Sequence, residues 1–230
     1  MSEMHNAVLV GAQNGRYHPM TRKKNNTLYT IGHSNHKIED FIRLLKTHEI
    51  SCIVDVRSAP YSRYCPQFNQ DMLALDLRAT DIEYIYLGDS LGARPPNTEC
   101  SNGNRVDFEC LAKTEEFKAG IDRLIEAASH NRLALMCAEK EPLQCHRTIL
   151  ICKHLRTHTL SIKHILADGG IENHADAERR LVRMLKIEPN LFEPEKTQAD
   201  LIQQAYDSQA AIISHDTEAE PSTTYHTLKP

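Results

Sequence analysis

Four short polar segments hold the residues of this chain that could do chemistry. They read IGHS, DVRSAPYSR, GDSLGAR and CAEKEPLQCHR, at residues 31–34, 55–63, 88–94 and 137–147. Each segment follows a short apolar run of the kind that forms a buried parallel strand. In an open α/β sheet, ligands bind beyond the carboxyl ends of the strands, where the loops leave the sheet. We therefore predict that the four segments meet in one polar site.

The segment CAEKEPLQCHR has the most reactive residue types. A helix that begins near Cys145 would point free backbone N–H groups at the site and would favour an anion there. The same field would lower the pKa of the Cys145 thiol, while His146 or Glu139 could serve as acid or base. Cys137 is a further catalytic candidate, although it could point back into the sheet. In the simpler interpretation Cys145 only starts a helix, and His146 and Arg147 cap it or face solvent.

Arginine and serine side chains give the same site a capacity for anions. The predicted substrate-binding residues are Arg57, Ser58, Arg63, Arg94, Arg147 and Ser34. Arginine suits this role because it forms forked hydrogen bonds with phosphate and carboxylate groups. Asp55 and His33 are candidates for catalysis, with Asp55 orienting a histidine or a water. Alternatively, Asp55 is a brace for Arg57, because a buried carboxylate is costly unless it is paired, and His33 is a hydrogen-bonded loop residue.

The motifs imply no cofactor. GDSLGAR is neither the GxGxxG fingerprint nor the GxxxxGK[ST] phosphate loop of nucleotide-binding proteins. A divalent metal is possible if several potential ligands come together, namely Cys137, Cys145, His33, His146, Asp55 and Glu139. However, no pair of them has the spacing of a zinc finger or of HExxH. We assign no metal ligands from the sequence and keep a divalent metal as an alternative.

Cysteine usage indicates thiols rather than disulfides. The chain has seven cysteines, an odd number, and none of them forms a CxxC pair. Neither a secreted disulfide framework nor a zinc ribbon fits this pattern, so we expect reduced thiols.

The hydrophobic pattern predicts strands and helices in alternation. The predicted strands are residues 28–32, 51–56, 82–87, 132–139 and 161–166. The predicted helices are residues 34–50, capped by Ser34 or Asn35, and residues 69–80, 114–129, 145–158 and 174–187. This alternation is typical of βαβ units. We therefore expect a single three-layer α/β domain over residues 27–190, with a mainly parallel sheet flanked by helices.

Three further segments are expected to lie around this domain. Residues 1–26 mix polar residues with Gly, Pro and a basic run, which predicts a flexible N-terminal extension. Residues 191–230 are expected to form a C-terminal extension that is helical over about 194–213 and then disordered. The polar stretch that begins at GDSLGAR and ends near residue 108 is expected to run over the surface.

Composition limits the class of protein. With 230 residues, 40% of them hydrophobic, the chain is long enough for one substantial domain. Its formal net charge of -4 gives no general attraction to nucleic acid, which could bind only through a local site. The start of the chain is unlike a leader peptide and no apolar stretch approaches bilayer length, which predicts a cytoplasmic protein without a membrane partner. The oligomeric state is left open.

Taken in order, these segments resemble a known family. IGHSN, DVRSAPYSR with PQFN, LGDSLGAR, MCAEKEPLQCHR and HILADG are similar to the domain of unknown function 488 family, over residues 28–172. The resemblance implies a single α/β domain but no activity. The matched hallmark positions are His33, Ser34, Asp55, Arg57, Ser58, Pro60, Ser62, Arg63, Gln67, Phe68, Gly92, Arg94, Cys137, Glu139, Cys145, His146 and Arg147. The family usually reads LGGR, so Ala93 would alter this loop if a glycine is needed there for a positive φ or a close approach.

These residues support three hypotheses about function. The leading one is an enzyme that transfers or hydrolyses a group on a small anionic or nucleotide-like substrate, since no redox-cofactor fingerprint is present. The second is a module that binds an anion, a nucleotide or a nucleic-acid end without turning it over. The third is a metal-dependent hydrolase.

Overall fold

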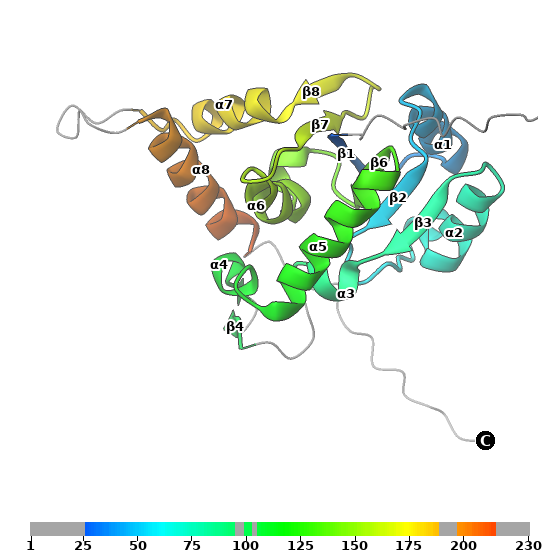
Figure 1. Ribbon diagram of the computed structural model, residues 1–230, viewed down its shortest axis with the longest axis horizontal. Helices are drawn as coiled ribbons and strands as arrows, with labels where there is room; N and C mark the ends of the chain where they lie inside the picture. The colour runs from blue at the N-terminus through cyan, green and yellow to red at the C-terminus, as the bar shows by residue number, and fades with distance from the viewer. Residues whose placement is uncertain (1–25, 95–98, 103–104, 189–196, 215–230) are drawn as a thin grey trace, which may run out of the picture.

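The structure is a computed structural model that describes residues 26–94, 99–102, 105–188 and 197–214 (Figure 1). Within these residues the strands form a six-stranded sheet, in the order β3-β2-β6-β1-β7-β8, and a two-stranded hairpin. The strands of the large sheet are β1 (Thr27–Gly32), β2 (Cys52–Asp55), β3 (Glu83–Tyr86), β6 (Leu133–Cys137), β7 (Ser161–Ile165) and β8 (Ile171–Asn173). The first five are parallel, as predicted, and β8 is antiparallel to β7. β8 has only three residues, too few to show a pattern in the sequence.

Helices cover both faces of the sheet. The longer ones are α1 (Ile38–Thr47), α2 (Gln70–Arg78), α5 (Glu115–His130), α7 (His174–Met184) and α8 (Gln198–Ile213). The shorter elements are α3 (Gly88–Leu91), α4 (Phe108–Leu111) and a π-helical segment (Arg147–Cys152) that continues into α6 (Lys153–Leu155). All the predicted helices are present. One detail is wrong: α1 has Lys37 at its N-cap, without a side-chain cap, instead of Ser34 or Asn35.

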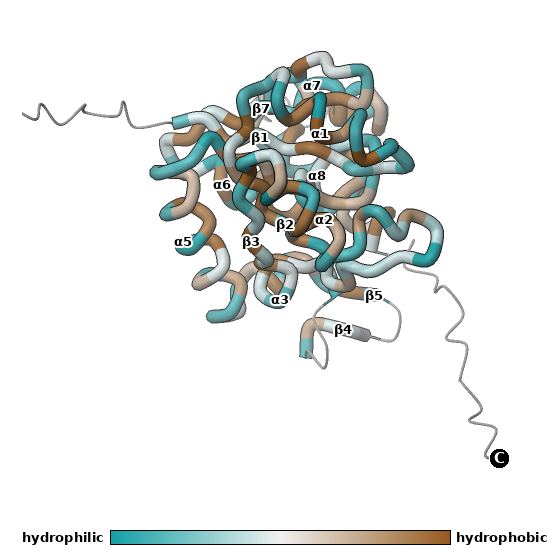
Figure 2. Tube along the Cα trace, turned by 90° about the vertical axis from the view of Figure 1, so that its right-hand side faces the viewer, coloured by the Kyte–Doolittle hydropathy of each residue, from teal (hydrophilic) through white to brown (hydrophobic). Residues whose placement is uncertain are grey.

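Two hydrophobic clusters, one on each face of the sheet, produce three layers. Side chains alternate along a strand: in β6, Leu133, Leu135 and Cys137 face one cluster, and Ala134 and Met136 face the other. The first cluster is covered by α5, α6, α7 and α8, and the second by α1 and α2. Figure 2 shows hydrophobic residues along β2 in the interior of the molecule. The predicted three-layer α/β architecture is therefore confirmed.

The order of the strands decides which loops meet. β6 lies between β1 and β2, with Asp55 beside Met136. Just past the strand ends, the backbone N–H of His33 donates to the carbonyl of Cys137 at 2.9 Å, and that of Val56 donates to the carbonyl of Met136 at 3.1 Å. The loops that follow β1, β2 and β6 therefore leave the same edge of the sheet side by side.

α8 packs as part of the domain. It is the helix expected over about residues 194–213, and a capping box of Thr197 and Asp200 begins it. Ala205 and Tyr206 on this helix have no exposed surface and belong to the same hydrophobic cluster as α5 and α7. This part of the expected C-terminal extension therefore contributes to the core.

Some expectations fall outside the described residues. Of the flexible extension expected at residues 1–26, only Asn26 is described, and of the disordered end only Ser214 is described. Among the helices of the described part of the chain, none is long and apolar enough to cross a bilayer.

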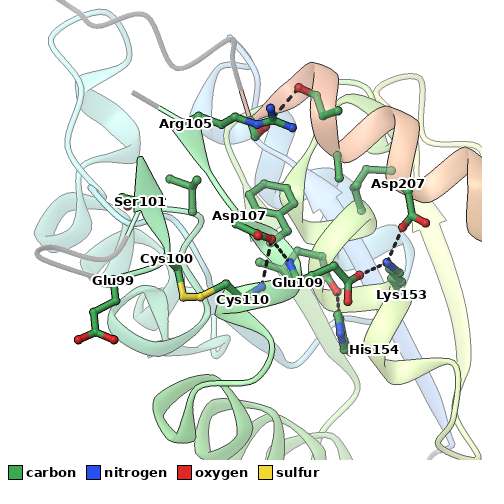
Figure 3. Close-up of a pocket in the computed structure, with 17 residues that line it drawn as sticks. Glu99, Cys100, Ser101, Arg105, Asp107, Glu109, Cys110, Lys153, His154 and Asp207 are labelled. Carbon is green, nitrogen blue, oxygen red and sulfur yellow. Dashed lines mark hydrogen bonds and ion pairs between the residues drawn. A yellow bond between two sulfur atoms is a disulfide. The ribbon is translucent and has the colours of Figure 1, made fainter. Parts of the chain in front are cut away.

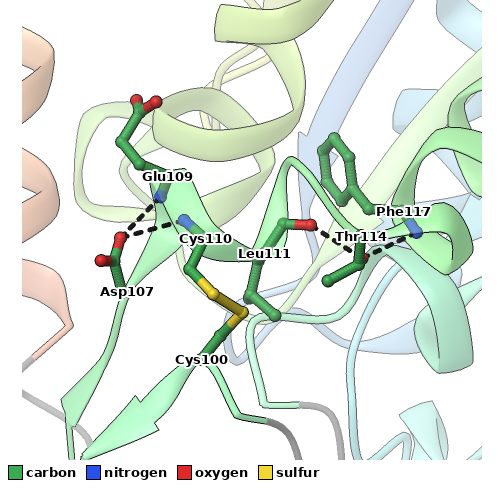
Figure 4. Close-up of a disulfide and its surroundings, with 7 residues drawn as sticks. All are labelled: Cys100, Asp107, Glu109, Cys110, Leu111, Thr114 and Phe117. Carbon is green, nitrogen blue, oxygen red and sulfur yellow. Dashed lines mark hydrogen bonds between the residues drawn. A yellow bond between two sulfur atoms is a disulfide. The ribbon is translucent and has the colours of Figure 1, made fainter.

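The stretch expected to run over the surface contains a disulfide. It includes the hairpin of β4 (Ser101–Asn102) and β5 (Arg105–Val106), which is followed by α4. Cys100 and Cys110 are bonded to each other across this hairpin, with their Cα atoms 5.4 Å apart (Figure 4). The expectation of reduced thiols is therefore wrong for this pair. The sequence does not reveal the pairing, because the two cysteines become neighbours only when the chain reverses at the hairpin.

A chain of buried polar side chains links the sheet to α7 and α8. His164 Nδ1 lies 2.8 Å from Thr30 Oγ1, and His164 Nε2 lies 3.0 Å from His174 Nδ1. His174 Nε2 lies 3.0 Å from the hydroxyl of Tyr206, which donates to Glu178 at 2.9 Å. Burial lowers the pKa of both histidines, that of His174 to about 4. Both rings are therefore neutral near pH 7.

We expect Tyr206→Ala to lower the free energy of unfolding by about 3–5 kcal/mol, because removal of a fully buried ring leaves a cavity. Tyr206→Phe should lower it by about 1–3 kcal/mol, because His174 and Glu178 lose their shared partner. Urea unfolding followed by circular dichroism measures both changes. The control Ile212→Ala, at a side chain 49% exposed, should have an effect below about 0.5 kcal/mol. Equal effects of Tyr206→Ala and the control would show that α8 does not pack on the core.

The buried histidines predict a loss of stability in mild acid. In the unfolded chain His174 gains its proton near pH 6.5, whereas in the folded chain it does so only near pH 4. The unfolded state therefore binds more protons in this interval, so the stabilisation is complete above about pH 6.5 and is lost as the pH falls towards 4. We expect His174 to contribute roughly 3 kcal/mol to this loss. Urea unfolding at several pH values measures the slope, and a slope unchanged in His174→Gln would contradict the prediction.

Candidate functional site

A pocket of about 320 Å³ opens at the carboxyl ends of the central strands. Its polar lining comes from residues 57–59, 93–94, 137–139, 144 and 146. Three of the four predicted segments, those that follow β2, β3 and β6, therefore meet in one place. Among the described residues, the segment that follows β1 does not line this pocket.

Four side chains of the types that bind metals or act as nucleophiles lie together here, three of them in the lining of the pocket and Cys145 behind them. One atom from each of Cys137, Glu139, Cys145 and His146 lies within 4.8 Å of the others, and we call these four residues the cluster. Cys145 Sγ is 2.9 Å from Glu139 Oε2. His146 Nδ1 is 3.5 Å from Cys137 Sγ and 4.0 Å from Cys145 Sγ. Cys137 ends β6, and the loop that follows returns to place Cys145 and His146 beside it.

The orientation of His146 is fixed by a backbone carbonyl. Its Nε2 lies 3.0 Å from the oxygen of Val56, which can only accept a hydrogen bond, so Nε2 carries a proton. His146 Nδ1 is thereby directed at the two thiols. Burial acts to lower the pKa of His146, but hydrogen bonding to Cys145 and the charges of Cys145 and Glu139 outweigh burial and raise it. The ring is thus held ready to carry a proton at Nδ1.

The two thiols differ in their affinity for protons. Burial raises the pKa of Cys137 well above its ordinary value. Burial acts in the same direction on Cys145, but the hydrogen bond with Cys137 and the charge of Arg147 outweigh burial and lower the pKa of Cys145. Cys145 is therefore the thiol of the pair that loses its proton more readily.

Glu139 is the exposed member of the cluster. Its side chain reaches the surface, while its Oε2 contacts Cys145. Burial acts to raise its pKa, but the positive charge of His146 and hydrogen bonds from Cys137 and Cys145 dominate and lower it to about 2. The carboxylate is therefore ionised at the mouth of the pocket.

Arg147 lies beneath the cluster and not in the pocket. Its side chain has no exposed surface. Its Nη1 donates to the carbonyl of Glu139 at 2.6 Å, and its Nη2 donates to the carbonyl of Lys140 at 3.4 Å. The guanidinium holds the loop after β6 by these two hydrogen bonds, and the role of Arg147 in substrate binding stays a prediction.

Cys145 stands at the start of a helix, as the sequence suggests. Its carbonyl accepts hydrogen bonds from the N–H groups of Thr148 and Ile149 at 3.0 and 3.1 Å. Its sulfur accepts the N–H of Arg147 at 3.4 Å. The thiol therefore receives one of the free N–H groups of the helix start, which favours its thiolate form.

Asp55, Arg57 and His33 form a buried brace beside the pocket. Asp55 accepts from Nε and Nη2 of Arg57, at 2.9 and 2.6 Å, and from the hydroxyl of Tyr84 at 2.8 Å. The Nδ1 of His33 donates to the carbonyl of Ser34, so its Nε2 accepts from Arg57 Nη1 at 3.1 Å. Burial and the charge of Arg57 lower the pKa of His33 to about 4, so this ring is neutral. Asp55 and His33, both predicted as catalytic, do not line the pocket and instead position Arg57.

The lining of the pocket also includes donors for an anion. Arg94 is exposed there, and its backbone N–H donates to Ser58 Oγ at 2.8 Å. Arg57 also reaches the lining, mostly buried. Arg63 is exposed but does not line the pocket, and Ser34 lines a separate cavity. Of the six predicted substrate-binding residues, the structure therefore brings Arg57, Ser58 and Arg94 to the pocket.

Gly92 allows the loop that follows β3 to approach Ser58. A Cβ atom on Gly92 would lie 2.4 Å from Ser58 Oγ and 2.3 Å from the carbonyl oxygen of Gly88. The φ of Gly92 is −67°, so the glycine is needed for space and not for a left-handed backbone. Ala93, which departs from LGGR, is not among the described residues with a positive φ and packs against the hydrophobic core. The alanine is therefore accommodated without backbone strain.

Sequence reasoning missed the apolar side of the pocket. Val106 and Phe108 belong to the hairpin and α4, while Ile213 and Ser214 belong to the end of α8. These elements reach the pocket only through packing between segments far apart in the chain. No local pattern in the sequence identifies them.

A larger cavity of about 530 Å³ lies beside this pocket and has a different character (Figure 3). Its lining includes the disulfide of Cys100 and Cys110. The ammonium group of Lys153 there is paired with Glu109 and Asp207. Because its two sulfurs are bonded to each other, the larger cavity has no free thiol among its described lining residues.

Comparison with known proteins gives the family of the chain. The family model described as "Domain of unknown function DUF488" matches residues 37–153, just over half of the chain. The chain belongs to this family. The match includes the cluster, Arg57 and Arg94, whereas IGHSN and HILADG lie outside it. No curated protein and no solved structure matches the chain.

We expect Asp55→Ala to lower the free energy of unfolding by about 3–5 kcal/mol, because the substitution leaves the buried charge of Arg57 unpaired. Urea unfolding measures the change. Asp122→Ala, at an exposed position of α5, is the matched control and should stay within about 0.5 kcal/mol of the unmodified protein. A similarly small effect of Asp55→Ala would mean that Asp55 does not brace Arg57.

Proposed function

We propose that this protein is an enzyme that hydrolyses or transfers a group on a small anionic or nucleotide-like substrate bound in the pocket. The observation that carries the proposal is that three members of the cluster, Cys137, Glu139 and His146, line the same pocket as Arg94. A site that only bound an anion would gain nothing from an ionised Glu139 at its mouth, because like charges repel. A carboxylate in that place is explained if it takes part in a reaction.

Arg94 is the group that would hold the anionic part of the substrate. Its exposed guanidinium can form two parallel hydrogen bonds with a phosphate or carboxylate group. Ser58 Oγ fixes the backbone of this residue, and Gly92 makes that contact possible. The pocket volume of about 320 Å³ lies at the lower end of the range for small-molecule sites. These features favour a substrate no larger than a mononucleotide.

The cluster would supply the chemistry. Cys137, Glu139 and His146 line the pocket, whereas Cys145 lies behind them. A thiol beside an imidazole is an arrangement used in nucleophilic catalysis, and the Nδ1 of His146 is directed at both sulfurs. The exposed Glu139 carboxylate is within reach of a substrate and could accept or return a proton.

Incubation of the purified protein with an extract of small metabolites, followed by mass spectrometry, tests the proposal. We expect at least one anionic compound to be consumed. Glu139→Gln and His146→Ala should slow its consumption by roughly 10²–10⁴-fold, because they remove a proton carrier. Arg94→Gln should mainly raise KM, because it removes a contact with the anionic group of the substrate that is equally strong in the bound substrate and in the transition state.

Arg123→Gln, at an exposed arginine of α5, is the control for Arg94→Gln and should leave consumption unchanged. Circular dichroism confirms that each variant is folded. The enzyme proposal fails if no compound is consumed, or if Glu139→Gln and His146→Ala consume it as fast as the unmodified protein. A compound that is retained by the protein but never altered would favour the non-catalytic binding module.

A further inference from the structure

We propose that the cluster holds a divalent metal ion and that zinc is the ion it suits best. The ligand atoms would be the sulfurs of Cys137 and Cys145, the Nδ1 of His146 and a carboxylate oxygen of Glu139. The metal site itself is argued from geometry alone. Its place in a reaction rests on the proposed function, because the ion would then lie at the reactive wall of the pocket.

The distances within the cluster fit a tetrahedral site. Zinc binds sulfur at about 2.3 Å and nitrogen or oxygen at about 2.0–2.2 Å, so neighbouring ligand atoms should lie roughly 3.3–3.8 Å apart. His146 Nδ1 is 3.5 Å from Cys137 Sγ and 4.0 Å from Cys145 Sγ. The contact of 2.9 Å between Cys145 Sγ and Glu139 Oε2 needs to lengthen by less than 1 Å, which the exposed glutamate side chain allows.

His146 has the second contact that is typical of metal-binding histidines. Such residues nearly always donate their other ring N–H to a carboxylate, a carbonyl or a water, which fixes the ring. Here Nε2 donates to the carbonyl of Val56 at 3.0 Å. This hydrogen bond leaves Nδ1 directed at the centre of the cluster.

The charge of the site also favours a divalent cation. Cysteines bind metals as thiolates, so with an ion bound the two cysteines and Glu139 would supply three negative charges. Arg147, fully buried beneath them, supplies one positive charge. A divalent ion would therefore leave the buried site neutral, which avoids the cost of an uncompensated charge away from water.

The donor set selects among metals. Two thiolates with one imidazole and one carboxylate suit zinc, whereas calcium and magnesium prefer oxygen ligands only. Three of the four ligands are rigidly placed, since Cys137 ends a buried strand and the adjacent Cys145 and His146 begin a helix. Glu139 is the most exposed of the ligands that line the pocket, and it could yield its position to a substrate oxygen. When bound, a zinc ion there would supply Lewis-acid activation of such an oxygen.

Two measurements on the full-length, chelator-treated protein test the metal site. The first is the absorption spectrum after loading with Co²⁺, which replaces zinc and whose bands depend on its ligands. The second is the affinity for Zn²⁺, measured by competition with a chromophoric chelator. We expect one equivalent of metal, thiolate-to-cobalt charge-transfer bands and the intense visible bands of tetrahedral Co²⁺. Cys137→Ser, Cys145→Ser and His146→Ala should each weaken Zn²⁺ binding by at least roughly 100-fold, since loss of an outer-sphere partner alone weakens binding by 10–100-fold. Glu139→Gln should weaken it less and leave the charge-transfer bands in place.

Cys65→Ser is the matched control, because Cys65 is a free, half-buried thiol outside the cluster. This variant should bind one equivalent of Co²⁺ and show the same charge-transfer bands as the unmodified protein. Circular dichroism shows whether each variant is folded. The unmodified protein decides the matter if a variant unfolds: the absence of charge-transfer bands, or a spectrum of octahedral Co²⁺, overturns the metal site. Equal loss of affinity in Cys65→Ser and in the cluster variants overturns it as well.

This failure can be told apart from failure of the proposed function. If chelator-treated protein without metal still consumes its substrate, the enzyme stands and the ion's place in the reaction is overturned. If the protein binds zinc through the cluster but alters no metabolite, the metal site stands and the proposed function fails.

Discussion

The structure of the site depends on the buried guanidinium of Arg147. By donating to the carbonyls of Glu139 and Lys140, it turns the loop after β6 back towards the strand from which it came. Only then do Cys145 and His146 lie beside Cys137. Gly32, at the end of β1, makes room for this arrangement: a Cβ there would lie 1.9 Å from the carbonyl oxygen of Glu139 and 3.2 Å from Arg147 Nη1. Two segments of the sequence, residues 31–34 and 137–147, therefore meet around one cation.

A second buried guanidinium holds the opposite side of the site. Arg57 is tied to Asp55 and His33, and its position fixes the start of the loop that carries Ser58. Each buried arginine is compensated in a different way, Arg57 by a carboxylate and Arg147 by carbonyls and by the sulfur of Cys145. Buried charges of this kind are costly, so they are kept where geometry matters. Between them the two arginines leave the cluster little freedom to move.

The sequence predicts the parts of the molecule that obey local rules. The central strands are continuous apolar runs, and their shared edge follows from parallel pairing, which is why the loops containing Arg57, Arg94 and Cys145 could be expected to meet. The burial of Arg147 could not be predicted, because a charged residue is expected to be exposed unless its partners are known. The partners of Arg147 are backbone carbonyls, which leave no signal in the sequence. The disulfide of Cys100 likewise depends on a chain reversal that leaves no periodic signal.

Two cysteines, a histidine and a glutamate are proposed to form one metal-binding centre at the end of β6 and the loop that follows. X-ray absorption at the zinc edge of the zinc-loaded protein tests it most directly, because this measurement counts the sulfur atoms around the ion. We expect two sulfur neighbours at about 2.3 Å and two nitrogen or oxygen neighbours at about 2.0–2.2 Å. A shell of oxygen and nitrogen atoms without sulfur would contradict it.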